Sequence, residues 1–258
     1  MERGLMNVVK PKKNLGQHFL KDQNIARKIV DSLNAKTANV LEVGPGMGVL
    51  TRYLLERKEL TVHAVEIDKE SIEFLQKNYP EISKRLYSED FLKFDFLSHF
   101  QEDFSVIGNF PYNISSQIFF KVLDYRDYIP EVVGMVQKEV AERISAGHGN
   151  KTYGILSVLL QTFYNIEYLF TVSEHVFVPP PKVKSAVVRL TRNQRQTLPC
   201  YDKLFVNVVK TAFNQRRKML RNSLKEFGEY IPLQFSEKRP EQLSVNDFIL
   251  LATAIEKR

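Results

Sequence analysis

Residues 39–48 read Asn39-Val40-Leu41-Glu42-Val43-Gly44-Pro45-Gly46-Met47-Gly48, an apolar run followed directly by a glycine-rich turn. The run predicts a buried strand, and the pattern of residues 47–57 predicts a helix after the turn. Glycines let the backbone pass close to a ligand, and the start of a helix offers free N–H groups. Nicotinamide-dependent enzymes share such a turn, so the turn alone identifies no single cofactor.

Strand and helix patterns alternate along the chain around this stretch. Asp22 is placed to cap a helix that runs to about Leu33. Further strands are expected at 61–67, 85–88, 104–108 and 132–136, and further helices at 69–78, 115–123, 138–145 and 155–163. Two late strand-like runs, 164–170 and 185–191, have no helix between them and predict an antiparallel edge hairpin. The pattern predicts an α/β fold with a Rossmann-like, doubly wound, mostly parallel sheet.

The two ends of the chain differ from this central pattern. The first 20 residues are polar and basic and include Pro11 and Gly16, so we expect an arm rather than a strand there. After the polar linker 191–199, only helical patterns occur. We therefore expect two domains: residues 1–191, including the basic N-terminal arm, and residues 192–258 as a small all-helical domain.

Composition narrows the class of protein. Of the 258 residues, 43% are apolar and 26% are charged, values that are ordinary for a globular protein. The single cysteine, Cys200, excludes a disulfide framework and lacks a Cys or His partner at metal-ligand spacing, so no metal is expected. No stretch is apolar and long enough for a membrane span, and the N-terminus lacks a signal-peptide core. We expect a cytoplasmic protein without a membrane partner.

The net charge of +7 is unevenly distributed. Residues 1–28 contain seven Lys and Arg against two acidic residues, and residues 192–258 contain thirteen against seven. The middle of the chain is therefore slightly acidic. Two basic ends around such a centre favour binding of an anionic polymer, with the basic segments holding its flanks. A solvated lysine-rich surface would give the same count of charged residues.

The tetrapeptide Asn109-Phe110-Pro111-Tyr112 ends the apolar run 104–108. It therefore lies at the carboxyl end of a predicted strand, where open α/β sheets bind ligands. An amide oxygen beside a flat ring is suited to holding the exocyclic amino group of a planar base. The alternative is a turn whose Tyr112 packs in the core.

Two acidic residues occupy corresponding places on neighbouring predicted strands. Glu66 lies 22 residues after Gly44, at the end of the second strand, where a carboxylate can accept both ribose hydroxyl protons. Asp90 follows the third strand and could accept a hydrogen bond from an adenine amino group. Alternatively, Glu66 pairs with Lys69 and Asp90 caps a helix.

With these motifs in place, the sequence resembles the S-adenosylmethionine-dependent ribosomal RNA adenine dimethyltransferases, and the bacterial small-subunit enzymes most closely. The resemblance covers the chain from the basic arm into the helical tail. The matching segments are Lys12–Leu20, Glu42–Gly48, Val65–Asp68, Ser88–Asp90, Gly108–Ser115, Val178–Ser185 and Ala212–Asn222.

The resemblance implies a role for each matching residue. His18 and Leu20 match arm positions that contact the cofactor, and Gly44 matches the glycine beside its methionine portion. Glu66 and Asp90 match the binders of its ribose and adenine. The residues matched to the target base are Asn109, which also touches the cofactor, Pro111, Tyr112 and Phe177. Phe177 could instead be plain core packing ahead of the proline run. This chain has Phe110 and His18 where the family frequently has Leu or Ile and Asn.

The resemblance also implies the activity. Methyl groups would pass from S-adenosylmethionine to N6 of two adjacent adenines in a loop near the 3′ end of small-subunit (16S) ribosomal RNA. The RNA, within a 30S assembly intermediate, would be the partner of a monomeric enzyme. Arg216, Arg217, Lys218 and Arg221 lie within two predicted helical turns and would hold RNA phosphates, unless they form only a solvated helix face.

Three other functions compete with this one. An erythromycin-resistance-type methyltransferase would modify one adenine of large-subunit RNA with the same core, but the segment Asn214–Asn222 favours the small-subunit enzyme. An RNA-binding assembly factor with little catalysis is opposed by the intact Gly44, Glu66, Asp90 and Asn109. A nicotinamide dehydrogenase would leave Asn109–Tyr112 and the basic tail unexplained.

Overall fold

The computed structural model describes residues 9–257, which divide into two compact units. The first unit extends to Ala141 and also contains Glu167–Arg192, whereas the second contains Glu142–Ile166 and the residues from Asn193 onward. The sequence places the boundary near the same point, after residue 191, but assigns 142–166 to the first domain. These residues group with the tail because α7 (Ile155–Phe163) packs against α8 (Asp202–Asn214) and α11 (Val245–Glu256).

The described residues form a seven-stranded sheet in the order β4-β3-β2-β5-β6-β9-β7. Its strands are β2 (Asn39–Val43), β3 (Thr61–Glu66), β4 (Leu86–Ser88), β5 (Phe104–Asn109), β6 (Glu131–Gln137), β7 (Tyr164–Val172) and β9 (Ser185–Arg192). The strands from β2 to β6 pair in parallel, while β9 runs antiparallel to β6 and β7 forms the edge beyond it. This is the mostly parallel, doubly wound sheet with an antiparallel edge that the alternation predicts.

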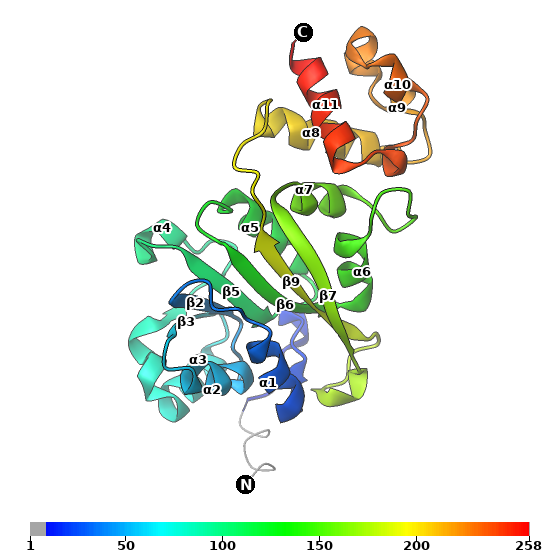
Figure 1. Cartoon of the computed structure of the whole chain (residues 1–258). Helices are drawn as coiled ribbons and strands as arrows, with labels where there is room; N and C mark the ends of the chain where they lie inside the picture. The colour runs from blue at the N-terminus through cyan, green and yellow to red at the C-terminus, as the bar shows by residue number, and fades with distance from the viewer. Residues whose placement is uncertain (1–8, 258) are drawn as a thin grey trace. The chain divides into compact units, whose positions relative to one another are not determined.

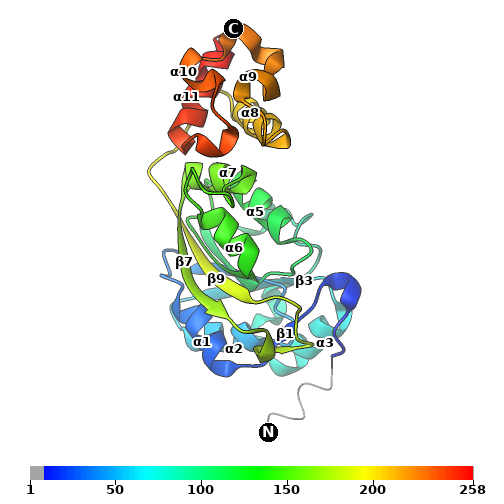
Figure 2. The ribbon, with the colours of Figure 1, turned by 90° about the vertical axis from the view of Figure 1, so that its right-hand side faces the viewer.

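Helices cover both faces of this sheet. Those that begin in the first unit are α1 (Gln23–Asp31), α2 (Val49–Glu56), α3 (Lys69–Asn78), α4 (Phe96–His99), α5 (Ser115–Asp124) and α6 (Lys138–Ser145). Helices α1, α2 and α3 lie on one face and α5 on the opposite face (Figures 1 and 2). Asp22 caps α1 as expected, because its carboxylate accepts hydrogen bonds from the backbone N–H groups of Asn24 and Ile25. None of the helices in residues 9–257 has the length and apolar character needed to cross a bilayer.

The core below the tetrapeptide explains why Phe110 is tolerated. Its ring is fully buried and packs edge-on against Phe119 of α5, with ring centres 5.9 Å apart. A Cβ atom at Gly134 of β6 would lie 2.5 Å from the Phe110 ring. Gly134 therefore leaves the space that the phenyl ring fills, and Phe110 belongs to the core although it also lines the cavity described below.

The N-terminal arm contains a short strand, contrary to the expectation of an arm without one. β1 (Phe19–Leu20) pairs antiparallel with β8 (Phe177–Val178), and Leu20 lies opposite Phe177. A two-residue strand has no periodic pattern of its own. Its partner follows more than 150 residues later, so no local signal marks it.

The second unit is helical apart from the start of β7. In addition to α7, α8 and α11, it contains the short helices α9 (Leu220–Ser223) and α10 (Leu233–Ser236). Phe213 of α8 stacks on Phe248 of α11 with ring centres 5.7 Å apart, and the ring of Tyr153 packs edge-on against Phe213. These contacts give the unit a core of its own.

Candidate active site

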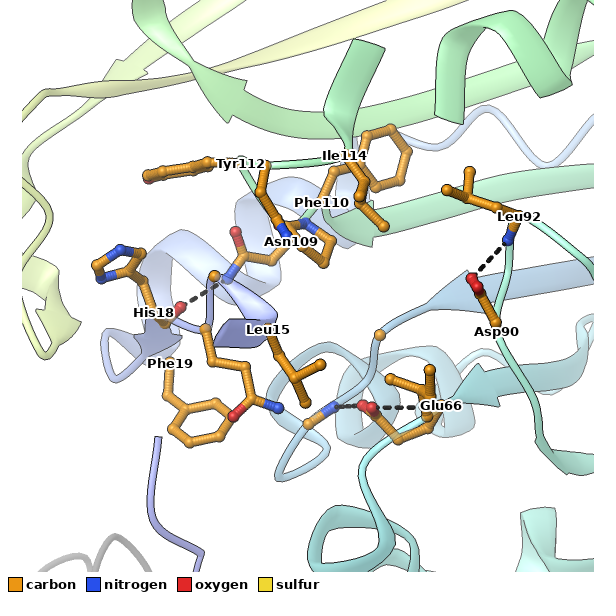
Figure 3. Close-up of a pocket in the computed structure, with 17 residues that line it drawn as sticks. Leu15, His18, Phe19, Glu66, Asp90, Leu92, Asn109, Phe110, Tyr112 and Ile114 are labelled. Carbon is orange, nitrogen blue, oxygen red and sulfur yellow. Dashed lines mark hydrogen bonds between the residues drawn. The ribbon is translucent and has the colours of Figure 1, made fainter. Parts of the chain in front are cut away.

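A cavity of about 210 Å³ lies at the carboxyl ends of β2, β3 and β5 in the first unit (Figure 3). This is the edge where parallel α/β sheets bind ligands. Its wall contains seven of the residues that the sequence assigns to the site: His18, Gly44, Glu66, Asp90, Asn109, Pro111 and Tyr112. Strand ends that are distant in the sequence therefore meet around one space.

The glycine turn and Glu66 are joined by hydrogen bonds. One carboxylate oxygen of Glu66 accepts from the backbone N–H of Gly46 at 3.0 Å, and the other accepts from Ile67 and Asp68 at 2.9 Å each. Burial raises the pKa of Glu66, while these three N–H groups oppose that rise. Glu66 and Lys69, both described, form no ion pair with each other. Backbone groups thus fix the carboxylate on the cavity wall.

Gly44 occupies the start of the turn with φ of 63°, a conformation that side chains rarely adopt. A Cβ atom there would lie 4.0 Å from the nearest atoms, on the Pro111 ring. The residue is therefore required mainly by its backbone angle. The turn that results brings bare backbone to the cavity, as the sequence predicts.

Asp90 lies in a tight turn at the same edge. Its Oδ1 accepts a hydrogen bond from the N–H of Leu92 at 2.9 Å, and its backbone carbonyl accepts from Lys93 and Phe94. Oδ2 accepts no hydrogen bond from the described residues. Asp90 therefore closes a turn rather than caps a helix, since the next helix, α4, is capped by Asp95. Its other oxygen remains available to a ligand.

Asn109 lies at the end of β5 with its amide orientation fixed. Its Nδ2 donates to the backbone carbonyl of His18 at 2.9 Å. Because that bond identifies the nitrogen, the oxygen must face the other way. In Figure 3 this oxygen points toward the side of the cavity where Tyr112 lies. An acceptor is therefore presented beside an aromatic ring.

Tyr112 is held at both its hydroxyl and its ring. The hydroxyl lies 2.5 Å from Oγ of Ser185, and burial raises the pKa of Tyr112 while this bond opposes the rise. The imidazole of His18 stacks on the ring with centres 5.3 Å apart, and its Nδ1 lies 2.8 Å from the carbonyl of Pro179. Rings at that separation are in direct contact. No base fits between them, so a base would use the other face of Tyr112 or displace the imidazole.

Leu20 and Phe177 do not line the main cavity. Both are buried, at 3% and 1% exposure, in the same core cluster. Leu20 also lines a small adjoining cavity of about 30 Å³ that shares Gly44 and Asn109 with the main one. Phe177, expected on the second face of the base, instead lies in the core beside β1, where the β1–β8 pairing sets it opposite Leu20.

The arm is tied over the cavity by charged groups. Nζ of Lys12 forms ion pairs with Asp68 and, at 3.1 Å, with Glu70, and Gln17 also donates to Asp68. Burial opposes ionisation of Asp68, but the bonds from Lys12, Ser71 and Gln17 outweigh it and lower the pKa of this carboxyl. Leu15 to Phe19 thereby form one wall of the cavity.

Two residues at the cavities escaped the sequence analysis. Ile67 is 51% exposed although it is apolar, and it lines the cavity next to Glu66. Glu42 lies fully buried under the glycine turn, where it accepts a hydrogen bond from Oγ1 of Thr51 at 2.6 Å. Burial raises the pKa of Glu42 to about 8. The signal for Glu42 was present, since it is a carboxylate within an otherwise apolar strand.

The basic cluster of the second unit lies in and after the loop that follows α8, rather than on one helix face. Arg216 pairs with Glu241 at 3.9 Å, and Arg221 pairs with Glu237 at 3.0 Å. Arg217 and Lys218 are exposed and have no acidic partner among the described residues. Helix α8 ends at Asn214, before the cluster, so the helical spacing expected for the cluster is wrong. Residues 9–257 contain no group of His, Cys, Asp or Glu that could hold a metal ion.

Comparison with known proteins places this arrangement in a family. The family model described as "Ribosomal RNA adenine dimethylase" matches residues 8–251. The chain is 60% identical to "Ribosomal RNA small subunit methyltransferase A" of Parabacteroides distasonis, over 98% of this chain and 96% of that protein. It is 58% identical to the protein of the same name from Flavobacterium johnsoniae, over 97% and 98%.

Solved structures agree with this placement. A dimethyladenosine transferase from Plasmodium falciparum is similar with a TM-score of 0.76 and 28% identity, covering 91% of this chain and 96% of that one. The 23S rRNA methyltransferase ErmE shares the fold, with a TM-score of 0.68 and 24% identity over 93% of this chain and 100% of that one. The chain therefore belongs to the ribosomal RNA adenine dimethylase family.

Proposed function

We propose that this protein transfers methyl groups from S-adenosylmethionine to N6 of two adjacent adenines in a loop near the 3′ end of small-subunit ribosomal RNA. The product is N6,N6-dimethyladenine, formed during ribosome assembly. The observation that carries the proposal is the amide of Asn109, whose nitrogen is bound to the His18 carbonyl and whose oxygen is thus available beside Tyr112. The names of the 60% and 58% identical relatives support the small subunit as the source of the RNA.

The cavity fits a cofactor of this kind. Glu66 offers its remaining lone pairs to ribose hydroxyls, and Oδ2 of Asp90 offers an acceptor to an adenine amino group. Ile67, apolar and half exposed, provides a surface on which a purine packs. Gly44 brings bare backbone to the methionine portion, and His18 and Leu20 complete that end. Bound there, the cofactor supplies an electrophilic methyl group on a sulfonium.

The residues of the chain act mainly on the acceptor amine. Adenine N6 is a weak nucleophile because its lone pair is delocalised into the ring. Oδ1 of Asn109 and the carbonyl oxygen of Pro111 accept hydrogen bonds from the two N–H groups of N6. These bonds turn the lone pair of N6 toward the methyl group. The Pro111 carbonyl already accepts from Ile114 at 3.2 Å, which leaves its second lone pair for the base.

The transfer needs no strong base in the chain. A bond forms between N6 and the methyl carbon, the carbon–sulfur bond breaks, and the extra proton then leaves N6 for water. Positioning contributes roughly 7–11 kcal/mol in favourable cases. Fixed dipoles contribute a few kcal/mol more.

Tyr112 is the stacking surface for the extruded base. Stacking of a base on an aromatic side chain is worth about 1–3 kcal/mol. Because Phe177 is buried in the core, Tyr112 supplies this surface without a second phenyl ring opposite it. The proposed role of Phe177 is then to support β1 and, through it, the His18 carbonyl that holds Asn109.

RNA is held by the basic residues of the second unit. Arg217 and Lys218 are the members of the cluster without a local carboxylate partner, so they are the first candidates for phosphate contacts. Arg216 and Arg221 would exchange their bonds to Glu241 and Glu237 for phosphates. Loop RNA supplies bases that are easily extruded.

The test is methyl transfer to isolated ribosomal particles. Small and large subunits from a strain lacking this activity are incubated with the protein and labelled S-adenosylmethionine, and primer extension maps the label. We expect label on two adjacent adenines near the 3′ end of small-subunit RNA. Label on large-subunit RNA would contradict the proposed small-subunit substrate. RNA binding without any methyl transfer would indicate an assembly factor instead of an enzyme.

A further inference from the structure

Lys121 of α5 contacts the turn that carries Asp90. Its Nζ donates a hydrogen bond to the backbone carbonyl of Phe94 at 2.5 Å. Residues 90–94 form one helical turn, in which the N–H of Phe94 donates to the carbonyl of Asp90 at 3.0 Å. Lys121 therefore binds the carbonyl at the far end of the turn whose first residue is Asp90. Helix α5, in turn, begins three residues after Tyr112.

We propose that Lys121 is a positioning residue that holds Asp90 against the adenine of the cofactor and thereby sets the preference for an adenine over a hypoxanthine nucleoside. The proposal deepens the cofactor site described above and rests on the role of Asp90 there. Lys121 itself does not line the main cavity. It acts through the turn, by fixing the direction of the free carboxylate oxygen.

The turn depends on Lys121 because its end is buried. Phe94 is fully buried, and a buried carbonyl without a donor is costly, at about 1–3 kcal/mol. Among the hydrogen bonds of the described residues, the Lys121 ammonium is the donor for the Phe94 carbonyl. Loss of that donor is expected to make the turn rearrange until the carbonyl reaches water, which would move Asp90 as well.

Aromatic rings hold the ammonium in place. Nζ lies 4.7 Å from the ring centre of Phe96, 5.6 Å from that of Phe91 and 5.9 Å from that of Tyr125. These distances are within the range of cation–π attraction. Phe91 and Phe96 are buried, so the environment favours one position of the ammonium rather than a mobile surface lysine.

Charge around Lys121 supports the same arrangement. Burial lowers the pKa of Lys121, while the carboxylates of Asp90, Asp95, Asp124 and Glu89 oppose that change. Of these four carboxylates, Asp90 has the largest opposing effect. The carboxylate of Asp90 accepts a hydrogen bond from an adenine amino group but not from a hypoxanthine carbonyl.

The turn also separates two cavities. Leu92 lines both the main cavity and a second one, which is otherwise lined by Lys93, Phe94, Asp95, Gln117, Phe120, Lys121, Asp124 and Tyr125. Solvent space thus lies on both sides of Leu92, so this part of the turn is a thin wall, although Phe91 and Phe94 beside it are buried. A thin wall needs a specific contact to hold its shape, and Lys121 makes that contact.

The experiment compares two ligands by titration calorimetry on the full chain. S-adenosylhomocysteine carries the adenine amino group, and S-inosylhomocysteine carries a carbonyl in its place. Lys121→Met keeps the apolar stem and removes the donor. We expect it to weaken S-adenosylhomocysteine binding by roughly 3- to 10-fold, as for the loss of one well-placed hydrogen bond. We expect the affinity for S-inosylhomocysteine to stay unchanged.

Controls separate this role from a merely structural one. Lys93→Met removes an exposed lysine from the same turn and should leave both affinities unaltered. If Lys121→Met does not fold, Lys121→Leu, which also lacks a donor, should give the same loss of preference.

Two results would overturn the proposal, and they can be told apart. If Lys121→Met leaves the ratio of the two affinities unchanged, whether both fall or neither does, Lys121 does not set the preference, while the Asp90 site stands. Equal affinity of the unaltered protein for the two ligands, with no effect of Asp90→Ala, would remove the adenine site itself.

Discussion

The cavity of the first unit and the basic loop of the second hold their polar groups in opposite ways. Around the cavity, Glu66, Asp90 and Asn109 are each fixed by hydrogen bonds to the backbone. In the loop, Arg217 and Lys218 are exposed side chains without a fixed partner among the described residues. The first arrangement suits a small ligand recognised atom by atom, and the second suits a polyanion held by charge.

This contrast predicts which substitutions affect chemistry and which affect RNA affinity. A variant of the cavity should change catalysis or cofactor affinity with little dependence on salt. A variant of the loop should change the salt dependence of RNA binding and leave the chemical step intact.

Asn109→Ala should have the largest effect. Removal of the amide oxygen that polarises the acceptor amine should slow methyl transfer about 10²- to 10³-fold, as for loss of one preorganised catalytic group. Single-turnover transfer to small subunits measures this rate. Binding of the RNA should stay close to that of the unaltered protein. A fully active variant would show that the amide does not act on the acceptor.

Glu66→Ala should weaken cofactor binding by roughly 10- to 100-fold, because a charged acceptor of ribose hydroxyls is lost. Calorimetry with S-adenosylhomocysteine measures the change. Asp22→Ala is a suitable control, since it removes another carboxylate, the α1 cap, outside the cavity. Unchanged affinity in the Glu66 variant would exclude Glu66 from the site.

Glu42 should make stability depend on pH. Burial raises its pKa to about 8, so between the unfolded value near 4.5 and this value the folded state keeps a proton that the unfolded state releases. Stability is then fully present below about pH 4.5 and falls as pH rises toward 8. Glu42→Gln should remove this fall, which is a few kcal/mol at most because one pKa unit corresponds to about 1.4 kcal/mol.

Thermal unfolding of both proteins at several pH values between 5 and 9 (roughly the window set by linkage) measures this effect. The difference in melting temperature between Glu42→Gln and the unaltered protein should grow as pH rises. A constant difference over that range would show that Glu42 is already ionised in the folded protein.

Neutralisation of the basic loop should have the smallest effect on chemistry. Arg217→Gln together with Lys218→Gln should reduce the salt slope of RNA affinity by about two, since each lost phosphate contact reduces it by about one. Arg216→Gln together with Arg221→Gln should reduce it less, because those residues already pair with Glu241 and Glu237. Equal salt slopes of RNA affinity in the unaltered protein and both double variants would show that these side chains contact solvent and not RNA phosphates.

The sheet and most helices could be predicted because their signals are local. The bounds of β2, α3, α6 and α7 agree with those expected from apolar periodicity. The positions of Gly44, Glu66, Asp90 and Asn109 followed from strand ends, since parallel strands bring their carboxyl ends to one edge. Family resemblance added the identity of the ligand to this geometry.

What the sequence did not reveal depends on contacts between distant segments. The β1–β8 pairing joins residues far apart in the chain, and it buries Phe177 where a base contact was expected. The partners of Arg216 and Arg221 come from the residues after α9, so the pairing halves the free charge of the loop. Lys12 reaches Asp68 across 56 positions. No periodic pattern encodes such pairs.

One structure would test the arrangement of donor and acceptor most directly. Crystals of the full chain with S-adenosylhomocysteine and adenosine monophosphate would hold the cofactor product and a base that represents the acceptor. We predict that the base lies against Tyr112 with its N6 about 2.7–3.2 Å from both Oδ1 of Asn109 and the carbonyl of Pro111. A base bound with its amino group turned away from Asn109, or a cofactor product bound outside the glycine-turn cavity, would contradict the account.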